Sequence, residues 1–131
     1  MSLNNKTFFA PQLHIQSGVD DINFYKNGLG AKELRRWNND DGSIHLAEFE
    51  IDGAMFHLHE ESQRSKQLSP ETVSATTLLI GIFVSDPHKM VNNAELAGGQ
   101  VSSPVQDYDY GYRQGIIVDP FGHQWLIQKK I

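Results

Sequence analysis

The sequence predicts an α+β fold in which two βαβββ modules form a cupped mixed sheet. Three observations support this fold class: short segments alternate apolar and polar residues, two segments have helical spacing, and the same order of segments occurs twice. Landmark residues recur at a nearly constant offset, since Gly30 is matched by Gly99 and Asp52 by Asp119. Each half is too small to bury its sheet alone, so the two halves should share one core.

The first module is expected over residues 8–61. Its helix should begin at Ser17, the first residue of a capping box that Asp20 completes, and end at Gly28 or Gly30. An Asp-Gly pair predicts a tight hairpin before the last strand. Alternation predicts strands at residues 10–15, 31–37, 43–51 and 54–60.

The second module is expected over residues 76–131, after a polar linker at residues 62–75, so that residues 1–131 make a single domain. Asp86 followed by Pro87 is typical of the start of a helix, and the Gly98-Gly99 pair should end it. The strands of this module are predicted at residues 76–84, 100–106, 113–118 and 124–129.

The alternation also predicts which side chains face the helices. One apolar set has a period of two residues and should point toward the core: Leu13, Ile15, Phe56, Leu58, Leu78, Ile80, Ile82, Val84, Trp125 and Ile127. The opposite, concave face should carry Gln12, His14, Met55, His57, His59, Thr77, Leu79, Leu126 and Gln128. Three of the six histidines thus share the concave face. His45 has the parity of Ala47 and is predicted to be partly buried.

Composition and charge exclude several classes of function. The chain has 131 residues, a net charge of −5 and no cysteine, so disulfides and thiolate ligands are excluded. Its basic residues form no dense patch, so we expect no nucleic-acid partner. No apolar run approaches the roughly 20 residues that a membrane helix needs, and the N-terminal residues lack the pattern of a secretory signal. We therefore expect a cytoplasmic protein without a membrane partner.

The stretch MFHLHEE, residues 55–61, concentrates two histidines and two glutamates. Histidine titrates near neutral pH, and a carboxylate on the same face can orient its ring. His57, His59 and Glu61 are therefore candidate catalytic residues. The alternative is an ordinary strand end in which the glutamates are solvated and the histidines line a polar wall.

The histidines also raise the question of a metal site. His14, His57 and His59 share one predicted face, and imidazole suits zinc, iron, nickel or copper. Residues two apart on a strand are separated by about 6.5–7 Å, which two ligands of one ion can span. An ordinary polar cavity wall is the favoured interpretation, and we expect no metal cofactor. A divalent metal, if bound, would use these three histidines.

Two motifs carry a resemblance to a known family: FYKNGLGA at residues 24–31 and DPFGHQW at residues 119–125. With the hairpin at residues 45–61, they resemble the vicinal oxygen chelate superfamily of glyoxalases, bleomycin-resistance proteins, fosfomycin-resistance enzymes and extradiol dioxygenases. The pattern is most similar to a glyoxalase-like subgroup related to a phosphonate-operon protein. The resemblance implies paired modules around a cupped site, frequent dimerisation and, in the enzymes, a divalent metal that chelates vicinal oxygens of the substrate.

This chain departs from the positions that hold the metal in that superfamily. Three of the four positions correspond to Ala10, Leu79 and Leu126. Alanine and leucine have no lone pair to offer, so the usual ligand set cannot form. Only His57 matches a ligand position, although an alignment shift of one or two residues would bring Gln12 or His14 into play.

The segment DYDYGYRQ, residues 107–114, is predicted to be a loop rich in tyrosine. In relatives the matching loop covers the mouth of the cup, which implies ligand contacts by Tyr110 as an aromatic wall and Arg113 as an anion clamp. The alternative for Arg113 is a salt bridge that holds the loop. Trp37, at the end of an early strand, is expected either to line the ligand groove or to cap the core at a dimer edge. His14 is the fourth predicted ligand contact.

These observations predict a homodimer that binds a small organic molecule in a concave sheet pocket. Two alternatives remain open. The three-histidine face favours a metal-dependent lyase, isomerase or dioxygenase-type enzyme with a nonstandard site. The missing ligand positions favour a resistance protein that sequesters an antibiotic. The negative net charge favours a cationic ligand. The chain has no Ser-His-Asp signature, P-loop or dinucleotide fingerprint.

Overall fold

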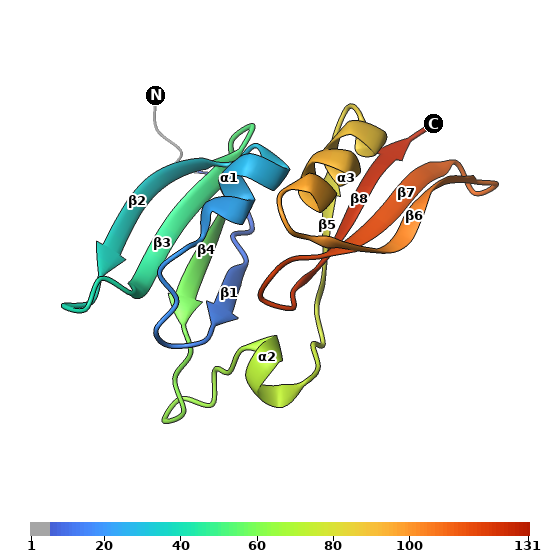
Figure 1. Ribbon diagram of the computed structural model, residues 1–131. Coiled ribbons are helices and arrows are strands. Elements are labelled where there is room, and N and C mark those ends of the chain that lie inside the picture. The colour runs from blue at the N-terminus through green and yellow to red at the C-terminus, as the bar shows by residue number, and fades with distance from the viewer. Residues whose placement is uncertain (1–5) are drawn as a thin grey trace.

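The computed structural model describes residues 6–131 and contains the predicted βαβββ order twice (Figure 1). The first module comprises β1 (Gln12–Ile15), α1 (Asn23–Leu29), β2 (Lys32–Asn38), β3 (Ile44–Ile51) and β4 (Ala54–Glu60). The linker holds the short helix α2 (Pro70–Val73). The second module comprises β5 (Leu79–Phe83), α3 (Pro87–Leu96), β6 (Gln100–Tyr108), β7 (Tyr112–Val118) and β8 (Gln124–Lys130).

The eight strands form two separate four-stranded sheets. The first sheet has the order β1-β4-β3-β2 and the second has the order β5-β8-β7-β6. Both are mixed, because β1 runs parallel to β4 and β5 runs parallel to β8, while the other pairs are antiparallel. In Figure 1, α1 and α3 lie in the middle of the molecule with one sheet on each side, and these helices contact each other. The α+β prediction of paired βαβββ modules is confirmed.

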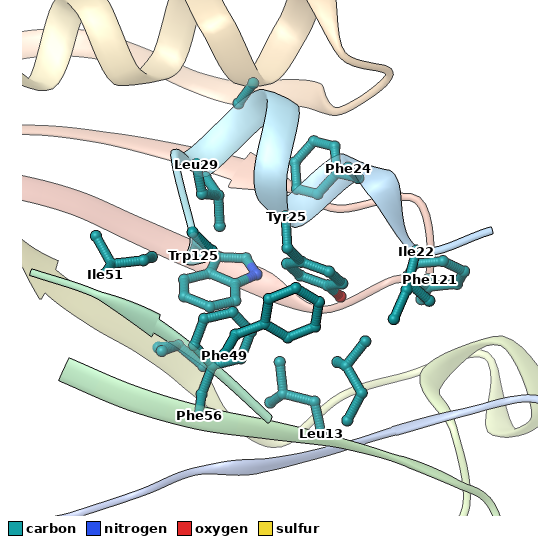
Figure 2. Packing of buried hydrophobic residues seen from close by; sticks show 14 of the residues in the cluster. Leu13, Ile22, Phe24, Tyr25, Leu29, Phe49, Ile51, Phe56, Phe121 and Trp125 are labelled. Atoms are coloured by element: carbon teal, nitrogen blue, oxygen red, sulfur yellow. The ribbon is translucent and has the colours of Figure 1, made fainter. Parts of the chain in front are cut away.

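The two modules share one hydrophobic core, as predicted. Its centre is a group of aromatic rings that come from both modules (Figure 2). Tyr25 of α1 lies among Phe49, Phe56, Phe121 and Trp125, with ring centroids 5.5–6.2 Å from its own for Phe56 and Trp125. The rings of Phe56 and Trp125, one from each sheet, lie 5.3 Å apart. Each sheet therefore turns its apolar face toward the other, and its second face away from the core.

Three of the four predicted helix ends are confirmed. Gly30 ends α1 in a left-handed conformation with φ of 68°, and the Asp86 side chain accepts a 3.1 Å hydrogen bond from Lys89 N at the start of α3. Ala97 caps α3 just before the Gly98-Gly99 pair. The predicted start of α1 is wrong, because the helix begins only at Asn23 without a side-chain cap. No helix in residues 6–131 is long and apolar enough to cross a lipid bilayer.

Several boundaries differ from the prediction because local contacts extend or shorten the strands. The segment at 107–114 is a tight hairpin, since β6 continues to Tyr108 and β7 resumes at Tyr112. The linker is partly helical, because Ser69 accepts a hydrogen bond from Thr72 N and starts α2. β5 begins only at Leu79. Leu78, predicted to face the core, is half exposed.

The register between β2 and β3 reverses the predicted orientation of His45. An irregularity between Trp37 and Asn38 shifts the pairing, so that Asn38 lies opposite Ile44 rather than opposite His45. Ile44 is consequently buried and His45 is exposed, with 49% of its side-chain surface accessible. The alternation of residues along a strand does not reveal an inserted residue of this kind. The predicted partial burial of His45 is therefore wrong.

Candidate functional site

The outer face of the first sheet, opposite the shared core, carries polar side chains in two rows across the strands. The pairing places Gln12, His57, Glu48 and Arg35 in one row. It places His14, His59, Leu46 and Trp37 in the next row. The alternating side chains Leu13, Ile15, Phe56 and Leu58 are buried on the other face. The structure therefore brings His14, His57, His59 and Trp37 together on one face.

The first row contains a carboxylate beside an imidazole. Glu48 accepts two hydrogen bonds from the guanidinium of Arg35, at 3.1 and 3.3 Å, and these bonds hold the pKa of Glu48 below its usual value. The second oxygen of Glu48 lies 3.8 Å from His57 Nε2, which is also 3.3 Å from Met55 Sδ.

Trp37, at the edge of the second row, is anchored by Arg35 of the first row. The guanidinium carbon of Arg35 lies 4.6 Å from the centroid of the Trp37 ring, which is a cation–π geometry. The indole remains 41% exposed on the open side. Sequence reasoning missed Glu48 and Arg35. A signal for Glu48 was present, because Glu48 and Glu50 alternate with the buried Ala47 and Phe49 and must therefore lie on the outer face.

The second row belongs to a cluster of histidines. The ring centroids of His14 and His59 lie 6.0 Å apart, and those of His59 and His45 lie 4.9 Å apart. His45 Nδ1 lies 2.6 Å from Glu60 Oε2, and the same glutamate accepts a hydrogen bond from Asn39. Burial lowers the pKa of His14, and the neighbouring His59 and His123 lower it further.

His14 also borders a hollow between β1 and the linker. This hollow has a volume of about 250 Å³. Its lining includes Gln12, His14, Leu68, Val73, Thr76 and His123. The ring of His123 has a structural role, because its Nε2 lies within hydrogen-bonding distance, 2.8 Å, of the backbone oxygen of His14. His14 thus has one side in the hollow and the other in the histidine cluster.

Glu61 is engaged by the linker. One carboxylate oxygen accepts a 2.9 Å hydrogen bond from Ser69 N, and the other accepts a 2.9 Å bond from Thr72 Oγ1. These bonds lower the pKa of Glu61, with the backbone bond from Ser69 as the largest cause. Within residues 6–131 no hydrogen bond joins Glu61 to His57 or His59. Its position orients the linker over the end of β1.

The outer face of the second sheet is aromatic and rich in amides. Tyr110, in the β6–β7 hairpin, lies between Tyr108 and Tyr112. Its ring stacks on that of Tyr108, with centroids 5.3 Å apart, and is tilted against that of Tyr112, at 5.7 Å. The Tyr110 hydroxyl donates to Gln114 Oε1, and Gln114 Nε2 donates to Gln128 Oε1 at 2.9 Å. The side chain of Tyr110 is 60% exposed and is available to a ligand.

Arg113 is not part of that face. It has the parity of Gly115 and Ile117, which are buried toward α3, whereas Tyr112 and Gln114 point outward. Its guanidinium makes a bidentate pair with Asp107, at 2.6 and 3.1 Å, which raises the pKa of Arg113 and lowers that of Asp107. The geometry is that of the structural alternative, in which the arginine holds the hairpin together.

The candidate residues of the two modules lie on opposite sides of one chain. Both sheets contribute their inner faces to the same core, so their outer faces point away from each other. His14, His57, His59 and Trp37 therefore do not meet Tyr110 within the chain. A site that combined the two sets would need residues from two copies.

The described donors do not fit a metal ion in their observed arrangement. Within residues 6–131, no three His, Cys, Asp or Glu side chains are placed to hold one. The carboxylate nearest to His57 is that of Glu48, which is occupied by Arg35. His59 directs its Nδ1 to the backbone oxygen of Glu60, at 2.6 Å.

Comparison with known proteins agrees with this architecture. An uncharacterized protein of Mycobacterium bovis is 28% identical over 134 residues, and the match covers 100% of this chain and 88% of that protein. The structure of TioX from Micromonospora sp. ML1 matches with a TM-score of 0.69 at 21% identity, covering 95% of this chain and 100% of TioX. The fosfomycin resistance protein FosX from Mesorhizobium loti matches with a TM-score of 0.65 at 8% identity, covering 96% of this chain and 93% of FosX. These two similarities show the fold.

A sequence profile of one family covers most of the chain. The profile of the Glyoxalase/Bleomycin resistance protein/Dioxygenase superfamily matches residues 14–127. The matched segment runs from within β1 to within β8 and so covers most of both βαβββ modules and the junction between them. The chain belongs to the glyoxalase/bleomycin resistance protein/dioxygenase superfamily.

Proposed function

We propose that this protein binds a small organic molecule against the outer face of the first sheet, with His14, His57, His59 and Trp37 as its contacts. The observation that carries the proposal is the register of β1 with β4, which sets His14 beside His59 and places His57 in the adjoining row. The three histidine side chains are half-buried rather than fully solvated, and Trp37 is exposed beside them. Imidazole and indole together offer hydrogen bonds and a flat apolar surface, as ligand sites require.

A second copy of the chain completes the site. The hollow beside His14 is about 250 Å³, smaller than the roughly 300–1,000 Å³ of most small-molecule sites. The outer face of the second sheet exposes large apolar side chains, with Leu79 44% and Phe83 55% accessible. Covering these side chains is favourable, and the first sheet of another copy would do so while closing the cup. The functional unit is a homodimer whose two cups each join one sheet from either copy.

In this arrangement Tyr110 faces the histidine row of the other copy. Its exposed ring then forms the aromatic wall predicted from the sequence. Arg113 stays outside the cup because it is bound to Asp107 on the face toward α3. Glu61 supports the linker beside His14 rather than taking part in chemistry.

A second candidate function is metal-independent acid/base catalysis at His57. The observation that favours it is the ionised Glu48, which lies 3.8 Å from His57 Nε2 and is held in place by Arg35. No described atom hydrogen-bonds the other ring nitrogen, Nδ1, so that nitrogen is free to exchange a proton with a bound molecule. Sequestration of an antibiotic uses the same cup without this proton transfer, and the resistance protein FosX shares the fold.

The experiment that tests the main proposal combines oligomeric state with binding. Sedimentation velocity should give twice the monomer mass, and Leu79→Glu, which puts a charge on the covered face, should give monomers. Titration with metal-free bleomycin, a cationic glycopeptide, and with the methylglyoxal–glutathione hemithioacetal should shift the His57 and His59 ring resonances of the dimer. A monomeric protein whose histidine resonances do not shift on addition of either compound would contradict the proposal. Turnover of the hemithioacetal that is lost in Glu48→Gln would favour the catalytic candidate.

Metal involvement is tested separately. Protein purified without chelators should contain no stoichiometric transition metal by elemental analysis. Metal present in the wild type but absent from His57→Ala would contradict the metal-independent proposal and favour a histidine-bound ion.

A further inference from the structure

We infer that the outer face of the second sheet is a recognition site for the acceptor oxygen of a planar, conjugated carbonyl compound, and that the side-chain amide of Gln128 is its hydrogen-bond donor. The inference rests on the proposed function, because this face forms the second wall of the composite cup. It names the chemical class of ligand that this wall selects.

Gln128 is a buried polar side chain on a face that is otherwise open. Its side chain alternates with the buried Trp125 and Ile127 and so points away from the core, yet the residue is only 8% exposed. Its Oε1 accepts a 2.9 Å hydrogen bond from Gln114 Nε2, and Gln114 Oε1 accepts one from the Tyr110 hydroxyl. This chain of hydrogen bonds has one direction, which fixes the amide so that Gln128 presents its NH₂ group at the far end.

That NH₂ group has no partner within the chain. No hydrogen bond from Gln128 Nε2 is formed within residues 6–131, and this part of the chain has no buried side-chain nitrogen or oxygen without a partner. The nitrogen therefore reaches the surface, where water satisfies it in the free protein. A bound acceptor can replace that water with little reorganisation, because Gln114 already holds the amide.

Gly81 makes room for this amide. A Cβ atom added at Gly81 would lie 2.9 Å from Gln128 Nε2, so the amide occupies the space that a side chain would fill. Gly81 sits on β5 between the outward-facing Leu79 and Phe83. The donor is therefore set level with the sheet surface, with an apolar side chain on either side. In the composite cup a flat ligand can rest on those side chains, between them and the facing sheet of the other copy, with its oxygen over the amide.

The surroundings favour an aromatic or conjugated ligand. Phe83 is the register partner of Gln128, and its ring lies 5.9 Å from that of Tyr112. Lys130 Nζ lies 5.8 Å from the Phe83 ring. A hollow of about 500 Å³ opens beyond the end of these strands, where Asp52 of the β3–β4 turn lines it together with Phe83 and Lys130. Exposed aromatic rings beside a hollow provide stacking surfaces for a planar molecule.

The charges on this face are compatible with an acceptor oxygen. β5, β7 and β8 contain no aspartate or glutamate, and the nearest carboxylate on β6, that of Asp107, is paired with Arg113. No carboxylate of these three strands therefore repels a carbonyl dipole or an enolate, and Lys130 attracts either. Asp52 lines the neighbouring hollow, where Lys129 and Lys130 outnumber it. The donor, the flat apolar surface and the charge all select the same kind of molecule.

The test compares two probes that differ in one carbonyl group, 1-indanone and indane. The full-length ¹⁵N-labelled protein is titrated with each compound while the side-chain amide resonances are followed. We expect 1-indanone to bind roughly three- to tenfold more tightly than indane, which is the value of one hydrogen bond. Binding of the ketone should shift the Gln128 NH₂ signals, and indane should leave them largely in place.

Three variants define the origin of the preference. Gln128→Leu removes the donor and Gly81→Ala displaces it, so both should bring the ratio of the two affinities close to one. Gln124→Leu is the matched control, since Gln124 is an exposed glutamine on the same strand with no described side-chain hydrogen bond, and it should keep the preference. The amide spectrum of each variant shows whether it is folded, and the ratio is unaffected by changes that alter both affinities equally.

Several results would overturn the inference. Equal affinity for the two probes in the wild type would do so, as would a ketone preference that survives Gln128→Leu, or binding of neither probe at millimolar concentration. The inference and the proposed function fail in different ways. A monomer that shows the ketone preference would disprove the composite cup and retain the Gln128 site. A dimer whose histidine resonances move while the Gln128 signals stay in place would retain the composite cup and disprove the Gln128 site.

Discussion

The hydroxyl of Tyr25 donates a 2.6 Å hydrogen bond to Oδ2 of Asp119, and this bond joins the helix of the first module to the last turn of the second. The same oxygen accepts a 3.1 Å bond from Trp125 Nε1, while Oδ1 accepts from the backbone N–H groups of Phe121 and His123. Burial, and then the adjacent carboxylate, raise the pKa of Tyr25 far above its usual value. The motifs FYKNGLGA and DPFGHQW therefore meet at a buried junction of the two modules.

Replacing Tyr25 with phenylalanine should weaken this junction. The variant loses one hydrogen bond to a buried carboxylate, which contributes about 1.5–3 kcal/mol. We expect the free energy of unfolding, measured by urea denaturation, to fall by that amount. Tyr108→Phe is the control, because the Tyr108 hydroxyl donates to no described acceptor, and it should change stability by less than about 0.5 kcal/mol. Equal effects of the two substitutions would show that the buried bond contributes nothing.

Gly28 permits the close approach of the two long helices. A Cβ atom at this position would lie 3.1 Å from the Ala94 Cα and 3.0 Å from a carbon of the Phe24 ring. Gly28→Ala should therefore destabilise the protein by about 1–3 kcal/mol through overpacking. Helix propensity alone predicts the opposite sign, a gain of up to about 1 kcal/mol.

The sign of the change in the urea midpoint decides between these effects. Asn27→Ala, at the exposed neighbouring position of α1, reports the propensity effect without the packing effect. A Gly28→Ala protein that is as stable as Asn27→Ala would mean that α1 and α3 can separate at no cost.

His14 should make the stability of the protein depend on pH. Its pKa is lower in the folded chain than the ordinary value of 6.5, chiefly because of burial. The unfolded chain therefore binds the proton more readily, and stability should fall as the pH drops below about 6.5. Urea unfolding at several pH values between about 5 and 8 should show a smaller loss for His14→Gln than for the wild type. Parallel curves for the two proteins would contradict this role.

Glu61 should contribute stability that acid removes. Its pKa is lowered in the folded state by hydrogen bonds from Ser69 and Thr72, so the contribution is present above about pH 4.5 and is lost as the pH falls through the folded pKa. Glu61→Gln should lower the urea midpoint at neutral pH, and the difference from the wild type should shrink in acid. Glu95→Gln, at an exposed position of α3, should match the wild type at neutral pH. A Glu61→Gln midpoint equal to that of Glu95→Gln would show that the linker does not depend on this carboxylate.

Period-two alternation was sufficient to assign most faces, because successive strand residues point to opposite sides of a sheet. It predicted correctly that Leu13, Phe56 and Trp125 are buried and that His57 and His59 lie opposite them. It failed where the backbone departs from regular pairing. The shift beside Asn38 buries Ile44 and exposes His45, and no residue type in that stretch signals it.

Side-chain partners were harder to predict than faces. The tyrosine-rich segment suggested that Tyr110 and Arg113 act together, but three residues of separation in a hairpin put them on opposite faces. Glu61 was assigned to the histidines by proximity in sequence, yet its hydrogen bonds go to residues 69 and 72. Each partner is set by how the chain returns through space, which short-range patterns do not encode.

The amino-acid sequence was enough to determine the βαβββ duplication, the shared core, the family resemblance and the face that carries His14, His57 and His59. These follow from local periodicity and motifs, which need no knowledge of distant contacts. Only the tertiary structure decided that Glu48, held by Arg35, lies beside His57, that Gln128 lies over Gly81, and that the two candidate faces point away from each other. The physical reason is that both sheets bury their apolar sides in one core, so the polar sides of a single chain cannot face one another.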